Sequence, residues 1–220
     1  MKRVLVRSLA LSTFFIAAGT SADGFGLGVK AGTLGGGIEG TIGISDSLNL
    51  RVGVNSASPS FDQTESDVKY RIAADLKSTA LLLDWHPFAG GFRVSAGVLD
   101  NKNAFHLRGQ PTGGTFTIGG ATFTSAEIGT LSGDVRFDKK TAPYVGLGWG
   151  NAATKGFGAS LEIGAMFHGK PQVELRSQGG TLSSDPSVQS ALREEEQDAE
   201  SDLESLKAYP VISLGLSYGF

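Results

Sequence analysis

The last ten residues, 211–220, constrain the fold more than any other stretch of the chain. Apolar side chains alternate there with small or polar ones, and a repeat of two residues is the period of a β-strand. One face is too apolar for water, and the other is too small and polar for a protein core. A strand with one face toward lipid and the other toward a polar lumen satisfies both. The apolar face consists of Ile212, Leu214, Leu216, Tyr218 and Phe220.

The amino terminus has the three parts of a secretory signal peptide. Basic residues open the chain, a mostly apolar segment covers residues 4–18, and small residues follow at 20–22. The apolar segment is too short and too interrupted to span a bilayer well, although an uncleaved anchor helix is the alternative. We therefore predict that residues 1–22 are cleaved after export and that residues 23–220 form the mature protein.

Composition agrees with a single exported β-domain. The chain has 32 Gly and no Cys, so neither a disulfide framework nor a thiolate metal site is possible. Removing Lys2, Arg3 and Arg7 from 19 basic residues leaves 16 against 22 acidic ones, a net charge near −6. This balance does not indicate a nucleic-acid partner. We expect no cofactor and no bound metal.

The same alternation recurs along the mature chain and predicts an all-β fold, an eight-stranded antiparallel transmembrane β-barrel. Short connections at 45–47, 87–91 and 151–155 alternate with long ones at 56–67, 109–140 and 170–208, as in outer-membrane barrels with short periplasmic turns and long external loops. A hairpin predicted around 115–124 makes a barrel of ten strands an alternative. Near Asp75 the apolar side chains change from even-numbered to odd-numbered positions, which indicates either a β-bulge or a strand that continues above the bilayer. The predicted strands are 24–33, 36–44, 48–55, 68–86, 92–108, 144–150, 157–168 and 211–220.

Residues 185–208 differ from the rest because they favour a helix. Asp185 is a suitable N-cap and Pro186 a suitable first helical residue. The segment carries a thin apolar stripe and a net charge of about −6, and it is inserted on the external side before the last strand. It is either a solvated surface helix, a lid across the barrel mouth, or a contact for a partner or for divalent cations bridging to lipopolysaccharide phosphates.

The strand pattern and the terminal Phe220 resemble the small OmpA-like and OmpW-like outer-membrane barrels of Gram-negative bacteria. The resemblance implies a place in the outer membrane, in contact with lipid and lipopolysaccharide. It also implies that Tyr218 and Phe220 are an assembly signal read by the barrel-assembly machinery. We expect a monomer with a structural or surface-interaction role and no enzymatic activity. The resemblance to OmpW-like proteins leaves a narrow channel for small or hydrophobic solutes as the alternative.

The inward faces of the predicted strands carry three charges of each sign. Isolated charges in a narrow lumen are costly, so we expect them to pair. Paired charges would tie the wall together and plug the lumen, whereas pairs that exchange partners would make a gated ion path. The predicted lumen charge network is Lys30, Glu39, Arg51, Asp84, Arg93 and Glu162.

The three histidines are the remaining candidates for chemistry. His86 lies beside a turn, and His106 and His168 are expected near the outer rim. A lipid-modifying enzyme could pair such a histidine with Ser and Glu, but the sequence contains no G-x-S-x-G nucleophile elbow. An enzyme is therefore the second alternative, and no catalytic residue is assigned.

Overall fold

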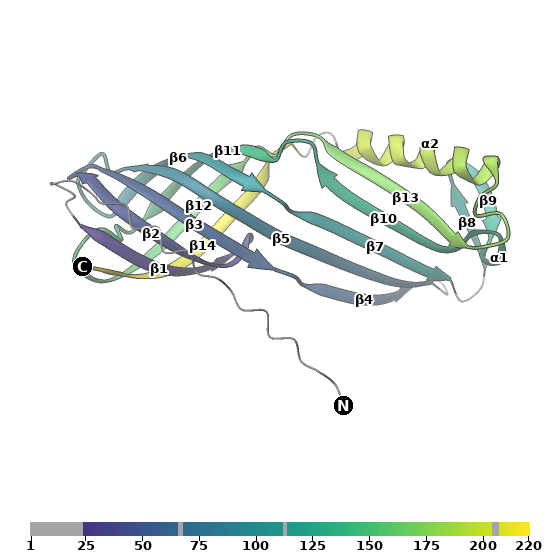
Figure 1. The fold of residues 1–220 in the computed structure, drawn as a ribbon, viewed down its shortest axis with the longest axis horizontal. Coiled ribbons are helices and arrows are strands. Elements are labelled where there is room, and N and C mark those ends of the chain that lie inside the picture. The colour runs from purple at the N-terminus through teal and green to yellow at the C-terminus, as the bar shows by residue number, and fades with distance from the viewer. Residues whose placement is uncertain (1–23, 66–67, 112–113, 204–206) are drawn as a thin grey trace, which may run out of the picture.

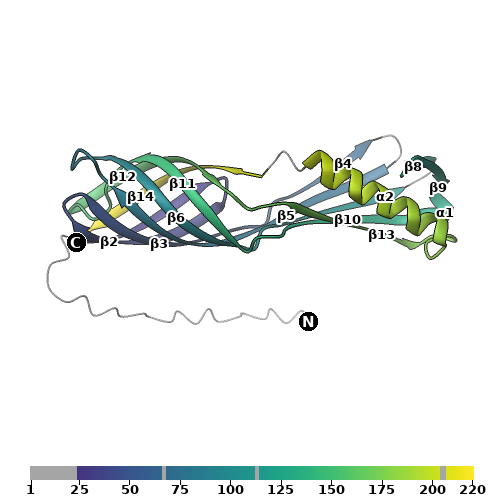
Figure 2. The ribbon, with the colours of Figure 1, turned by 90° about the horizontal axis from the view of Figure 1, so that it is seen from above.

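A computed structural model describes residues 24–65, 68–111, 114–203 and 207–220. The predicted signal peptide, residues 1–22, lies outside them. The molecule is elongated, with a ring of twisted strands at one end and a narrower extension at the other (Figures 1 and 2). The carboxyl terminus lies at the far end of the ring, away from the extension.

Eight antiparallel strands form a closed circuit of hydrogen-bonded pairs. The circuit runs β1-β2-β3-β5-β6-β11-β12-β14 and returns to β1. Each strand corresponds to one of the segments predicted from alternation, and the prediction of an all-β fold is confirmed. The strands are β1 (Phe25–Gly32), β2 (Gly35–Ser45), β3 (Leu48–Ala57), β5 (Val68–Trp85), β6 (Phe92–Asn101), β11 (Thr141–Trp149), β12 (Gly156–Met166) and β14 (Tyr209–Gly219).

The extension begins where β5 leaves the ring. Residues 76–85 of β5 pair with β3, whereas residues 68–75 pair with β4 (Ser60–Glu65) and β7 (Ala104–Pro111). The sheet then continues through β10 (Gly129–Phe137) to β13 (Pro171–Gly179). The pairings of β5 run without a register shift. The change in apolar positions near Asp75 therefore reflects a change of neighbouring strands, from β3 to β4 and β7, rather than a β-bulge.

Several segments predicted as loops are strands of this extension, which corrects the prediction of long irregular connections. Segment 56–67 contains β4, segment 109–140 contains β10, and segment 170–208 contains β13. The predicted strand 92–108 is also interrupted between β6 and β7, where the Lys77 amide donates a hydrogen bond to the side-chain oxygen of Asn103 at 2.9 Å.

The hairpin of β8 (Thr115–Ile118) and β9 (Ala121–Thr124) forms as predicted. It is a separate two-stranded sheet at the far end of the extension, so it adds no strand to the ring. A one-turn helix, α1 (Ser125–Ile128), follows it and was not predicted. Within the described ranges, no helix is both long and apolar enough to cross a membrane.

The acidic helix before the last strand is confirmed as α2 (Pro186–Leu203). Residues 204–206 of the predicted span 185–208 lie outside the described residues. Asp185 caps it by accepting a hydrogen bond from the Ser187 amide at 2.9 Å. The helix lies along β13 on the side of the extension, so the alternative of a lid across the mouth of the ring is wrong (Figure 1). Val188, Ala191 and Leu192 are buried against the β8–β9 hairpin and α1.

Two of the acidic side chains of α2 protect the edge of the extension sheet. Glu200 accepts a hydrogen bond from the Val173 amide at 2.8 Å, and Glu196 accepts one from the Leu175 amide at 2.6 Å. The glutamates are four residues apart on one helix face, and the amides are two residues apart on one strand edge. Unpaired edge amides can add a foreign strand, so the helix closes an edge that would otherwise be open.

Candidate functional site

Strand alternation separates two surfaces in the ring. On β14, Leu214 is 65% exposed on the outer face, whereas its neighbours Ser213 and Gly215 face inward and are less exposed. The other ring strands follow the same rule, because successive side chains of a strand point to opposite faces. The outer face is apolar, and the inner face carries the charged side chains.

The structure brings the six predicted charged residues together inside the ring. Each comes from a different strand, and five of them are buried, with Lys30 at the margin of the group. We call these six side chains the charge cluster: Lys30 on β1, Glu39 on β2, Arg51 on β3, Asp84 on β5, Arg93 on β6 and Glu162 on β12.

Arg51 is the centre of the charge cluster. Its Nε and one terminal nitrogen donate to the two oxygens of Asp84 at 2.8 and 2.9 Å. The same terminal nitrogen lies 2.6 Å from Glu162 Oε2, and the other lies 3.3 Å from Glu39. A single guanidinium therefore connects carboxylates from three strands, which its fork of five donors makes possible.

The remaining cations complete a neutral group of three positive and three negative charges. Arg93 donates to Glu162 Oε2 at 2.6 Å, and its Nε lies 4.0 Å from Asp84 Oδ1. Lys30 lies 3.1 Å from Glu39. Every buried charge in the group has an opposite charge in contact, so removal of any one member leaves another uncompensated.

Two uncharged partners of the charge cluster were not identified from the sequence. Tyr144 donates its hydroxyl to Glu162 Oε1 at 2.5 Å, and Ser95 donates to Asp84 Oδ1 at 2.6 Å. Both positions have inward parity in their strands, so alternation places them inside the ring. Neither residue carries a charge, so alternation alone did not distinguish either of them from the other inward-facing residues.

Small residues make room for these large side chains. A Cβ atom added at Gly146 would lie 2.5 Å from the Tyr144 hydroxyl, and one added at Gly148 would lie 3.1 Å from the guanidinium carbon of Arg93. Both distances are too short for an ordinary contact. Gly146 and Gly148 therefore have a packing role, as a narrow ring requires.

The interior is filled on both sides of the charge cluster. At the turn end, the Asn49 amide donates to His86 and to Asn151 at 3.1 and 3.0 Å. Between the charges and the extension end, a cavity of about 20 Å³ has room for about one water molecule. The layer at the extension end is apolar and includes Leu82, Leu99, Ala142, Met166 and Val211.

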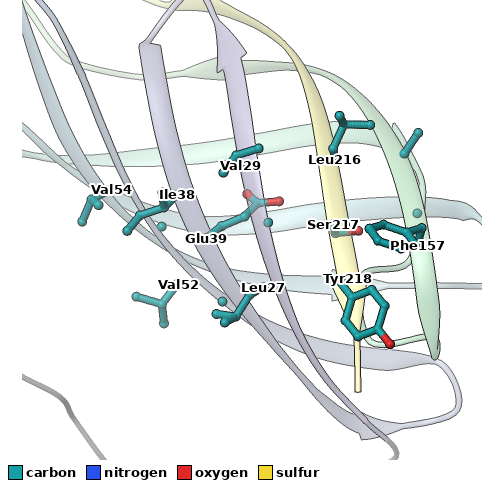
Figure 3. Close-up of a pocket in the computed structure, with 15 residues that line it drawn as sticks. Leu27, Val29, Ile38, Glu39, Val52, Val54, Phe157, Leu216, Ser217 and Tyr218 are labelled. Carbon is teal, nitrogen blue, oxygen red and sulfur yellow. The ribbon is translucent and has the colours of Figure 1, made fainter.

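The outer face of the ring is apolar and ends in a belt of aromatic residues. Figure 3 shows part of this face, where side chains such as Leu27, Val52 and Leu216 surround a shallow hollow of about 900 Å³. Aromatic belts at the edges of an apolar band are typical of strands that cross a membrane. The exposed aromatic residues at the turn end are Phe25, Trp85, Phe88, Trp149, Phe157, Tyr218 and Phe220.

The predicted assembly signal lies in this belt. Tyr218 and Phe220 are exposed and in edge-to-face contact, with ring centroids 5.1 Å apart. Phe220 also stacks on Phe25 and donates its amide to the Phe25 carbonyl at 2.8 Å. The chain end is thus held in the ring while its aromatic side chains remain accessible.

The histidines are held by groups other than serine or threonine hydroxyls in the described part of the chain. His106, on β7 in the extension, lies 2.5 Å from Asp134 and 3.6 Å from Asp75. His168 follows β12 and bonds to the Gly169 carbonyl at 3.1 Å. No group of three or more His, Asp or Glu side chains able to hold a metal ion is found among the described residues.

The all-β architecture with one large sheet, an apolar outer face and a charged interior is that of a small Gram-negative outer-membrane β-barrel protein. The crystal structure of Acinetobacter baumannii CarO2 aligns with a TM-score of 0.65 and 25% identity, covering 91% of this chain and 100% of that one. The crystal structure of A. baumannii CarO aligns with a TM-score of 0.62 and 23% identity, covering 89% and 97%.

These neighbours are outer-membrane β-barrel proteins, and the resemblance drawn from the sequence is confirmed at that level. The likeness to CarO2, at 25% identity, supports an outer-membrane location for this chain. No protein-family model and no curated protein matches the sequence. The narrower resemblance to OmpA-like or OmpW-like proteins stays a prediction.

Proposed function

We propose that this chain is an eight-stranded transmembrane β-barrel of the outer membrane, with a lumen plugged by the charge cluster and a structural or surface-interaction role. The observation that carries the proposal is the closed circuit of strands around six mutually paired charges. A ring of eight strands is just wide enough for its own side chains to fill. Here they leave a cavity of about 20 Å³.

The extension supports the surface-interaction part of the proposal. It projects from the end of the ring opposite the carboxyl terminus and the turns (Figure 1). With the turns and both ends of the mature chain in the periplasm, the extension stands outside the cell beside lipopolysaccharide. The aromatic chain end, with Tyr218 and Phe220, then faces the periplasm, where the barrel-assembly machinery would read it.

Conductance in planar bilayers tests the plug. The folded protein, purified without residues 1–22, should produce no steps above those of a protein-free membrane. Arg51→Ala combined with Tyr144→Ala removes two of the largest interior side chains and should produce small steps if the ring itself spans the bilayer. Discrete steps from the unaltered protein would contradict the proposal.

A narrow channel is the second candidate, and the geometry of Arg51 favours it specifically. This guanidinium touches three carboxylates, so partners can be exchanged without leaving any charge unpaired. Conduction by the unaltered protein that is lost in Glu162→Gln would support exchange. We propose no catalytic role, because the described histidines bond to carboxylates, amides and carbonyls rather than to a hydroxyl nucleophile.

A further inference from the structure

An apolar pocket of about 350 Å³ lies where the ring, the extension and the end of α2 meet. It is separate from the interior of the ring and shares no residue with the charge cluster. Phe105 and Val135 lie on the extension sheet. Leu203 lies in the last described turn of α2, and Tyr209 is the first residue of β14. The wall is therefore built by four separate parts of the chain, which are Phe105, Val135 with Phe137, His168 with Pro171, and the residues from Leu203 to Pro210 that line the pocket, namely Leu203, Ala208, Tyr209 and Pro210.

His168 is the polar group in this wall. Its ring lies against Phe137, with centroids 3.9 Å apart, and the side chain is buried. Nδ1 lies 3.1 Å from the Gly169 carbonyl oxygen, which can only accept, so Nδ1 carries the hydrogen. Nε2 is then an unprotonated acceptor.

The surroundings of His168 favour the neutral form of its ring. Burial lowers the pKa of His168 below its ordinary value, although Gly169 and Asp138 act in the opposite direction. The Tyr209 hydroxyl already donates a hydrogen bond to the Thr33 carbonyl at 2.8 Å, so Tyr209 contributes its aromatic ring to the pocket wall. The pocket thus combines flat apolar walls with one neutral hydrogen-bond acceptor.

These properties define the ligand. The volume lies at the lower end of the range for small-molecule sites, which are mostly apolar with a few placed polar groups. An ion would lose its hydration without gaining a partner. We propose that this pocket binds a compact, uncharged aromatic molecule that donates one hydrogen bond to Nε2 of His168.

Histidine NMR on the whole mature chain in lipid nanodiscs tests the proposal, because the protein has three histidines. Indole is the probe, since it is flat and has one N–H group. Indole should shift the Nε2 resonance of His168 and leave His86 unchanged. The matched probe 1-methylindole lacks the donor and should bind about two- to twelvefold more weakly, the usual effect of one hydrogen bond.

Two variants separate the hydrogen bond from simple partitioning. His168→Phe keeps a flat ring and should bind both probes with equal affinity; because this variant lacks the Nε2 signal, binding is followed there through the proton resonances of the probes themselves. Ala208→Trp fills the mouth of the pocket and should abolish the shift of Nε2, with the folded state checked by the heat-modifiable gel shift. The proposal is overturned if unaltered protein does not discriminate between the probes, if His168→Phe keeps the discrimination, or if lipid acyl chains contact Phe137 and exclude indole.

Discussion

Neutralising Glu162 should destabilise the ring more than any comparable surface change. Glu162 Oε2 accepts charge-assisted bonds from Arg51 and Arg93, both at 2.6 Å, and Oε1 accepts the Tyr144 hydroxyl. A hydrogen bond to a charged group contributes about 1.5–3 kcal/mol, and Glu162→Gln weakens two of them. The variant also leaves one buried positive charge in excess. We expect a loss of about 3–5 kcal/mol in the free energy of unfolding.

The companion variant is Arg93→Gln, which leaves one negative charge in excess and should cost a similar amount. The double variant of Arg93 and Glu162 restores a neutral group. Its cost should therefore be smaller than the sum of the two single costs, by about 1–3 kcal/mol. This coupling energy is the quantity that the ion-pair geometry predicts.

The assay is urea unfolding of the mature chain in phospholipid vesicles. Trp85 and Trp149 lie on the outer face of the ring and report its unfolding by fluorescence, with heat-modified gel mobility as a second probe. The control pair is Asp62 and Arg71 on the extension, whose two hydrogen bonds of 2.7 and 3.0 Å have similar geometry. Those side chains are 67% and 66% exposed, so solvent screens them and no coupling should be detected. Additive costs at Arg93 and Glu162 would refute the reasoning.

Three further predictions concern the outer face and the extension. Leu214→Arg should cost about 2–4 kcal/mol in vesicles if it faces the middle of the bilayer, whereas Ser213→Thr on the inner face should be mild; equal effects would contradict the facing assignment. Glu200→Ala should speed hydrogen exchange at the Val173 amide on the edge of β13. Glu194→Ala should not, because the described edge amides of β13 bond to Glu196 and Glu200 instead. Replacing 186–207 by a short Gly/Ser bridge should leave a ring whose gel mobility still changes on heating, because no ring strand is lost. In the full protein, protease added to intact cells should cut this region. Cleavage only after the outer membrane is opened would reverse the proposed topology.

The sequence determined the ring strands because each has one face in an apolar environment and the other in a polar one. Residues 211–220 show the effect most clearly: Leu214 and Leu216 lie outside, and Ser213 and Ser217 lie inside. The inward position of Arg51 followed from the same period of two. Asp185 also identified the start of α2, since capping is a local interaction.

Only the tertiary structure decided the extension. Val173 and Leu175 alternate with polar residues in β13, so a strand signal was present, but it is short and lies where a barrel is expected to have a polar loop. The strand β10 likewise lies in a segment where a barrel is expected to have a polar loop. Alternation predicts the face of the sheet on which a side chain lies, but it does not predict which strands are neighbours. The pairing of β10 with β7 and β13 could therefore not be derived from the sequence.

The same reason explains the partners within the charge cluster. Alternation placed six charges inside, but register and the closing of the ring decided that Arg51 would meet Asp84, Glu162 and Glu39 together. Glu162 is 111 residues from Arg51 along the chain, and no local pattern links them. Contacts at that separation exist because β12 and β3 face each other across the ring, which is a property of the closed sheet and not of either strand.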